Sequence, residues 1–231
     1  MSWPNNDDWQ ALSNEIVTVD NKDKYQLTTV DCGSLKVPSG RLICCDPFAD
    51  MDTTGNPYTE IPKGSYPVVV TLADVSENLD GSHIREAYAS LILGDVKNEC
   101  IRKPLKVITN DDTSGEKIEE GEYSGFGVDA GTACFVDAES LVEGMPNSSE
   151  WYEGLFENDK DDSWFNQMDN PNLIREGIAN IKLPLSKYDN NLILFHSGWG
   201  DGFYPIIGGY DSSDNLVAVH TDFFVVSDPE K

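Results

Sequence analysis

The chain has 231 residues, of which 39% are hydrophobic and 10% aromatic, and its 41 acidic against 16 basic residues give a formal charge of -25. This apolar fraction suffices for a packed core, and the length allows one large domain or two small ones. The charge excludes the basic face that nucleic acid binding needs, and it disfavours an anionic membrane surface. A basic protein or a cation remains as a charged partner, while an acidic surface that only keeps the protein soluble is the plainer interpretation.

No targeting or membrane segment is expected. The first residues carry neither a basic region nor an apolar run, and no apolar stretch approaches the length of a membrane span. The 5 cysteines include the adjacent pair Cys44 and Cys45 and form no C-x-x-C pair. An odd number without ordered spacing argues against a disulfide framework and a zinc site. We therefore predict a cytoplasmic protein with reduced, mostly buried thiols.

Short strands dominate the first half of the expected structure. The spacing of residues 9–19 allows a short amphipathic helix. Residues 35–37 and 42–45 are predicted as two short strands around a Pro-Ser-Gly turn. Residues 65–72 are rich in β-branched side chains, which favours a strand. Side chains alternate over residues 85–94, and this favours a strand over the helix that the same residues permit.

Helices are expected in an acidic insertion at about residues 138–180. Asp137 is placed to cap the first helix through its side chain. Trp151 and Phe156 keep helical spacing, and Trp164 opens a second group with the same spacing. Aromatic residues in this pattern more often face a core than bind a partner.

Strands return at residues 191–196, 204–210 and 216–226. A polar segment at residues 211–215 is predicted to form the hairpin turn between the last two.

Many short strands joined by glycine and proline turns predict a mainly β (α+β) fold. We expect a single β-rich sandwich or barrel-like domain over residues 30–226, with one or two helices in the acidic insertion. An N-terminal segment at residues 1–29 precedes it, and a frayed tail at residues 227–231 follows it.

Four segments in order carry a resemblance to a known family: residues 35–47, 63–68, 127–132 and 197–205. Together they resemble the bacterial domain-of-unknown-function family 4241, and the similarity spans residues 30–226. The resemblance implies a bacterial, single-domain protein. It implies no catalytic role, because the family has no established activity.

Residues 194–205, with the sequence LFHSGWGDGFYP, form the most informative segment. Glycine is used where the backbone needs positive φ or approaches another group closely, so three glycines here indicate a specified loop. Such a loop either holds a ligand or metal, or only shapes a sharp connection between strands.

Five aspartates lie at the edges of apolar or glycine-rich segments: Asp46, Asp129, Asp137, Asp201 and Asp222. Carboxylates that a fold brings together can bind a divalent cation, which activates water for hydrolysis. Each can instead cap a turn or helix through local backbone hydrogen bonds. One hypothesis is therefore a metal-dependent hydrolase with a divalent metal ion held by Asp129, Asp137 and Asp201.

His196 would serve as the acid or base of that enzyme, with Asp129 and Asp201 as the other catalytic residues. His196 is adjacent to Ser197, but neighbouring residues on a strand point to opposite faces and do not readily pair. A structural histidine is the plainer interpretation of both His196 and His220. Arg85, which precedes Glu86 at the start of a strand, is also of interest because the chain has so few cations.

The favoured hypothesis is an acidic, non-catalytic binding protein without a cofactor. Like an immunity-type module, it would dock or neutralise a basic protein, because complementary charge speeds association and sets specificity. Residues 150–164 are the predicted surface. They offer four aromatic anchors among carboxylates, the composition of interface hot spots: Trp151, Tyr152, Phe156 and Trp164. The oligomeric state stays open.

Overall fold

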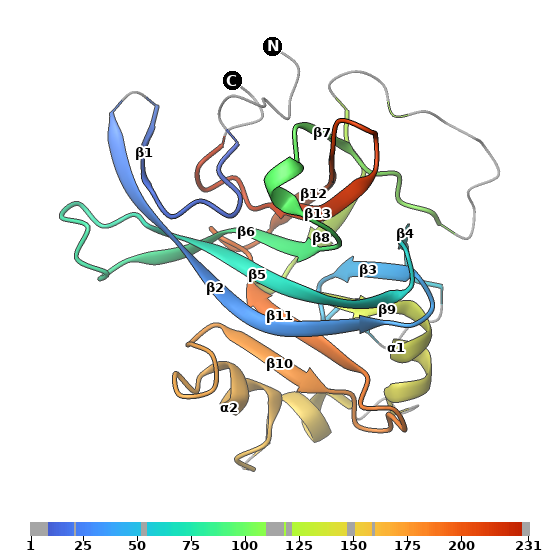
Figure 1. The fold of residues 1–231 in the computed structure, drawn as a ribbon. Helices are drawn as coiled ribbons and strands as arrows, with labels where there is room; N and C mark the ends of the chain where they lie inside the picture. Colours follow the sequence, from blue (N-terminus) through green and yellow to red (C-terminus); the bar gives the residue numbers. More distant parts are fainter. Residues whose placement is uncertain are drawn as a thin grey trace.

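Two antiparallel sheets form the architecture (Figure 1). The computed structural model describes residues 9–20, 22–51, 55–109, 118, 122–146, 151–158 and 160–227. Within these residues the first sheet has eight strands. Seven of them follow the order β1 (Ile16–Val19), β2 (Asp23–Val37), β5 (Gly64–Asp74), β6 (Ile84–Ile92), β13 (Leu216–Asp222), β12 (Gly202–Tyr210) and β7 (Ile101–Pro104). The eighth strand, β8 (Gly125–Val128), pairs with β12 outside this path. The second sheet, also within the described residues, has five strands in the order β10 (Ile178–Lys182), β11 (Asn191–His196), β9 (Thr132–Asp137), β3 (Arg41–Cys45) and β4 (Thr59–Glu60).

The second sheet is buried on both faces. Ile193 and Phe195 of β11 belong to the core between the two sheets, whereas Leu192 and Leu194 belong to an outer core on the opposite face. This division follows from the strand itself, because successive side chains point to opposite sides. The long strands β2 and β5 arch across the inner face, while α1 (Ala138–Gly144) and α2 (Trp164–Met168) cover the outer face (Figure 1).

The helical elements are short. They are η1 (Val96–Asn98), α1 (Ala138–Gly144), the π-helical turn η2 (Tyr152–Phe156) and α2 (Trp164–Met168). Three of them fall in the predicted insertion, although β10 already begins at Ile178. Asp137 caps α1 as predicted, since its carboxylate accepts a hydrogen bond from the Ser140 backbone N–H at 2.9 Å. The fold is mainly β with short helices, and this confirms the predicted class.

The helix predicted at residues 9–19 is wrong. Leu12 has a φ of 66°, and Ile16–Val19 form strand β1 against β2. Trp9 instead packs on Tyr88, with ring centroids 5.0 Å apart. Pairing with a neighbouring strand and this ring contact override the local helical spacing.

The two strands around the Pro-Ser-Gly turn exist, but they belong to different sheets. β2 is 15 residues long and lies in the first sheet, while β3 lies in the second. Gly40 has a φ of 78°, and a Cβ there would lie 2.8 Å from the Ile61 carbonyl oxygen. The turn therefore needs glycine to carry the chain from one sheet to the other.

The predicted strands in the later part of the chain are present. Residues 191–196 form β11, and β12 and β13 form an antiparallel hairpin. The closing strand ends at Asp222 rather than at residue 226, because Phe224 has a φ of 55° that is incompatible with a ladder. None of the helices in the described ranges is both long and apolar enough to cross a membrane.

Candidate functional site

The glycine loop after β11 is fixed by its own hydrogen bonds. Ser197 is fully buried, and its hydroxyl donates to the Gly200 carbonyl at 2.7 Å. The Tyr204 hydroxyl donates to the carbonyls of Ser197 and Gly200, at 3.0 and 2.8 Å. Gly198 has a φ of 60°, and a Cβ there would lie 2.8 Å from the Phe223 Cβ. Ser197 thus closes the loop and is not exposed as a nucleophile.

A second glycine-containing turn packs beside this loop. The Gly131 N–H donates to the Asp201 carboxylate at 3.1 Å, and the Ser197 N–H donates to the Gly131 carbonyl at 3.1 Å. Asp46 is buried and accepts hydrogen bonds from the Asp129 and Ala130 N–H groups, at 2.8 and 3.0 Å. Asp46 therefore stabilises a turn through backbone hydrogen bonds, which is the structural alternative to metal binding that the sequence left open for this residue.

The three carboxylates of the predicted metal site do not converge. Asp129 and Asp201 are exposed on the two adjacent turns. Asp137 lies at the other end of β9, about 16 Å from Thr132 along the strand. Both Asp137 oxygens are occupied, because one accepts from Ser39 and the other from Ser140. Among the residues that the structure describes, no group of three potential ligands is arranged to hold a metal ion.

His196 ends β11 and lies beside Glu86 instead of facing Asp129 and Asp201. The positions meet at Gly177, where a Cβ would lie 2.6 Å from His196 Nδ1 and 3.3 Å from Glu86 Oε1. Gly177 directly precedes β10 of the second sheet and Glu86 lies on β6 of the first, so this place connects the two sheets.

The charges around His196 have opposite signs. Burial lowers the pKa of His196, and the nearby carboxylate of Asp169 opposes this effect by raising the pKa. Arg175 and Arg85 lower the pKa of His196 further, and Glu176 raises it. The residue is exposed, so solvent reaches its side chain, and Nδ1 lies against Gly177. The lowered pKa favours the neutral imidazole.

Glu86 is the most unusual carboxyl of this region. Only 4% of the residue is exposed. Burial raises the pKa of Glu86 to about 7, although Arg175 and Arg85 counteract the rise. A group with a pKa near neutrality can take up or release a proton under ordinary conditions.

Two guanidinium groups beside Glu86 have unused donors. Arg85 Nε and Arg175 Nη1 are buried without a hydrogen-bond partner among the described residues. The Arg85 guanidinium also lies over the Trp199 ring, 5.5 Å from its centroid. We call the set of Arg85, Glu86, Arg175 and His196 the Glu86 cluster. Arg85 and Glu86 stood out in the sequence, but nothing there connected them with Arg175 and His196.

His220 belongs to a separate buried network on the first sheet. Its Nδ1 lies 2.8 Å from Ser90 Oγ, and its Nε2 lies 3.1 Å from Glu99 Oε2. Arg102 Nε donates to the other Glu99 oxygen at 2.6 Å. Burial alone would raise the pKa of Glu99, but His220 and Arg102 outweigh it and lower that pKa. Although the order hydroxyl, imidazole, carboxylate matches a triad, Ser90 and His220 are buried, so this arrangement supports the structural interpretation of His220.

The predicted partner anchors lie mostly in the outer core. Trp151, Phe156 and Trp164 are buried, and the Phe156 ring is 4.7 Å from that of Trp164. Tyr152 alone of the four is on the surface, at 37% exposure. Three of the four therefore fill space against the second sheet and cannot serve as surface anchors in this structure.

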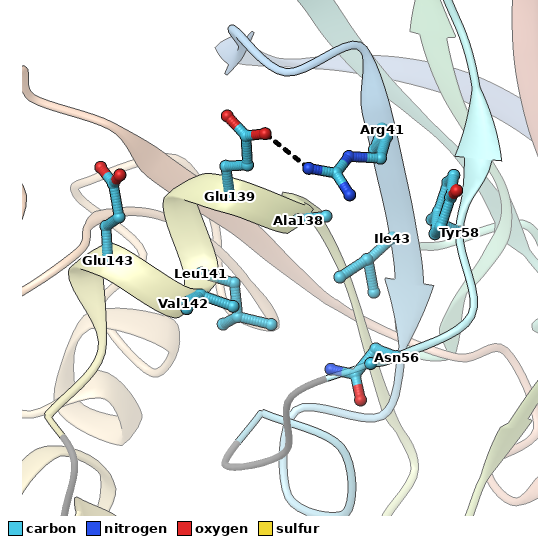
Figure 2. A pocket seen from close by; sticks show the side chains of 10 residues that line it. Arg41, Ile43, Asn56, Tyr58, Ala138, Glu139, Leu141, Val142 and Glu143 are labelled. Carbon is cyan, nitrogen blue, oxygen red and sulfur yellow. Dashed lines mark hydrogen bonds and ion pairs between the residues drawn. The ribbon is translucent and has the colours of Figure 1, made fainter. Parts of the chain in front are cut away.

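A pocket of about 290 Å³ lies between β3 and α1 (Figure 2). Arg41 reaches from β3 toward Glu139 on α1, and their charged groups are 2.5 Å apart. The same guanidinium lies 5.5 Å from the centre of the Tyr58 ring. Ile43 and Leu141 supply apolar lining. Arg41, which lines the pocket, is therefore already paired with Glu139.

The structure therefore defines a two-sheet β protein with a hydrogen-bonded glycine loop and a charged cluster between the two sheets. The chain belongs to the DUF4241 family, a family described as protein of unknown function, whose model matches residues 35–221. No curated protein and no solved structure is significantly similar to this chain.

Proposed function

We propose that this protein is an acidic, non-catalytic binding protein that docks a basic protein partner, in the manner of an immunity-type module. The observation that carries the proposal is an exposed aromatic and acidic surface at the glycine loop. We call it the loop surface, and it consists of Tyr123, Asp129, Trp199, Asp201 and Phe203.

Two of the three aromatic members of the loop surface are unusually exposed. Trp199 and Phe203 are 54% and 52% exposed. Tyr123 stacks on Phe203, with ring centroids 5.9 Å apart. Large aromatic side chains are the commonest anchors of protein interfaces, because they bury much area with little loss of conformational entropy. This surface takes the role that residues 150–164 had in the sequence-based prediction.

The carboxylates of the loop surface favour a cationic partner. Asp129 and Asp201 are exposed and lie on turns joined through Gly131. They add to a formal charge of -25, which steers a basic protein toward the surface and repels acidic ones. The hydrogen bonds of Ser197 and Tyr204 hold the loop in one shape, so little ordering is required on binding.

A bacterial cytoplasm is the proposed location. Cys32, Cys44, Cys45 and Cys134 are buried free thiols, and a reducing compartment preserves them. Cys45 and Cys134 lie with their sulfur atoms 3.4 Å apart in a thiol hydrogen bond.

The metal-dependent hydrolase is the weaker proposal. It needs Asp137 beside Asp129 and Asp201, whereas Asp137 holds Ser39 and the start of α1. Calorimetry with magnesium, manganese, calcium and zinc separates the two proposals. Stoichiometric binding that Asp201→Asn abolishes would favour the enzyme.

Affinity capture from the native host at low salt tests the binding proposal. The wild-type chain is compared with the double variant D129N/D201N and with the matched control D161N/D162N, which removes the same charge from the α2 side. We expect the wild type and the control to capture basic proteins, and we expect D129N/D201N to capture less of the same proteins. Equal recovery by all three chains, or partners without a basic bias, would contradict the proposal.

A further inference from the structure

We propose that the Glu86 cluster is a binding site for the oxyanion group of a small ligand, a phosphate or a carboxylate, held between Arg85 and Arg175. The site adjoins the loop surface, because Trp199 lies over Arg85, but its ligand binds without a protein partner. It lies where the beginning of β6 in the first sheet meets the start of β10 and the end of β11 in the second.

The unused guanidinium donors point to an anion. Arg85 Nε and Arg175 Nη1 are buried, and no group in the described chain accepts their hydrogen bonds. A buried N–H without an acceptor costs free energy, which a bound oxyanion or a water removes. Guanidinium groups match the planar geometry of phosphate and carboxylate oxygens, and a cation would be repelled by the two positive charges.

Convergence of two arginines is notable in a chain with only 16 basic residues. Arg85 and Arg175 both lie close enough to Glu86 and to His196 to change the pKa of each. Arg85 lies on β6 and Arg175 lies just before β10, so the tertiary fold brings them together. An acidic protein that concentrates two cations at one point creates a local attraction for anions.

The remaining members of the cluster suit an anionic ligand. Glu86, when protonated, donates a hydrogen bond and does not repel an oxyanion. The neutral His196 ring offers a further donor or acceptor at the solvent side. Gly177 lets His196 and Glu86 approach the backbone closely, because a Cβ at that position would lie only 2.6 Å from His196 Nδ1. Trp199 covers Arg85 on the outside.

Binding is expected to be stronger under mildly acidic conditions. An oxyanion favours the protonated form of Glu86, whose pKa burial has already raised to about 7. The charged groups that face the site from the surrounding elements are Arg85, Arg175, Asp169 and Glu176. The two exposed carboxylates oppose the ligand, and the two guanidinium groups attract it.

Nuclear magnetic resonance of the histidine rings tests the site on the full chain. The sequence has 3 histidines, so each ring can be followed separately. Inorganic phosphate and sodium acetate are titrated at mildly acidic pH against sodium chloride of equal ionic strength. We expect saturable shifts of His196, with His220 in its buried network unchanged. The phosphate and acetate arms show which oxyanion the site prefers.

Arginine variants decide the outcome. Arg175→Gln and Arg85→Gln are each expected to weaken binding about tenfold or more, because each removes a charge-assisted hydrogen bond. Arg41→Gln removes the same charge at a surface ion pair and is expected to leave the affinity unchanged. Arg85→Lys keeps the charge without the planar donors, so it remains informative if a glutamine variant does not fold. Shifts that only follow ionic strength, or that persist in every arginine variant, would overturn the proposal and assign the unused donors to water.

Discussion

Glu86 and His196 both pack against Gly177. A Cβ atom at this glycine would lie 2.6 Å from His196 Nδ1 and 3.3 Å from Glu86 Oε1. This contact joins a strand of the first sheet to the end of a strand of the second. A buried acid and a neutral imidazole with two guanidinium groups beside them make up the proposed oxyanion site, in which binding would be coupled to the protonation of Glu86. The stability of the fold should therefore depend on the ionisation of Glu86.

Glu86→Gln is expected to stabilise the protein at alkaline pH. Burial raises the pKa of Glu86 from 4.5 to about 7, so the contribution of this carboxyl to stability is complete below the unfolded pKa and is lost as pH rises through about 7. Glutamine has no proton to lose. The variant should be more stable by about 3 kcal/mol at about pH 8 and by about 1 kcal/mol or less at about pH 5. Urea unfolding at the two pH values measures the difference, and an equal effect at both would disprove the raised pKa.

Asp137→Ala is expected to destabilise the fold by about 2–4 kcal/mol, because it removes the cap of α1 and leaves Ser39 without its buried acceptor. Asp129→Asn is the control and should change stability by about 0.5 kcal/mol or less, since this side chain is exposed. Thermal or urea unfolding of both variants distinguishes a structural Asp137 from a metal ligand. If added magnesium stabilised the wild type and not Asp137→Ala, Asp137 would be a metal ligand, and a purely structural role would be contradicted.

Gly198→Ala tests whether the loop requires a left-handed residue. Its φ is 60°, and a Cβ would meet the Phe223 Cβ at 2.8 Å. Strain and overlap together should cost about 1–3 kcal/mol. Gly127→Ala is a matched control, because a Cβ there meets nothing within 4 Å. Similar unfolding free energies for the two variants would show that the loop is not tightly specified.

Aromatic truncations separate the loop surface from the outer core. Trp199→Ala and Phe203→Ala should each lower stability by about 1 kcal/mol or less, because both side chains are half exposed. Phe156→Ala should cost about 3–5 kcal/mol, because its ring is buried among other aromatic rings. Calorimetric or urea unfolding provides the comparison. A large loss for Trp199→Ala would mean that this residue serves the fold and not a partner.

The sequence predicted local structure well wherever one rule governed it. The β-branched run at residues 65–72 and the alternation at residues 85–94 became β5 and β6, and Asp137 became a cap. Residues 9–19 failed as a helix because strand pairing and the Trp9 contact with Tyr88 outweighed their spacing.

The site was harder to predict, because it depends on contacts between distant segments. Arg85 and Glu86 are neighbours in the sequence, but only tertiary packing brings Arg175 and His196 to Glu86. The acids of the glycine-rich turns were recognisable as candidates, but Asp137 faces Ser39 at the far end of β9. Trp151, Phe156 and Trp164 had the helical spacing typical of core residues, and their acidic neighbours wrongly suggested a surface.

The most direct measurement is calorimetric titration of the captured basic partner with the wild type, D129N/D201N and D161N/D162N at low and high salt. If the loop surface docks a cationic protein, the affinity falls as salt rises, and D129N/D201N binds more weakly with a shallower salt dependence, while D161N/D162N matches the wild type. An affinity that ignores salt, or that both double variants lower equally, would contradict docking at the loop surface.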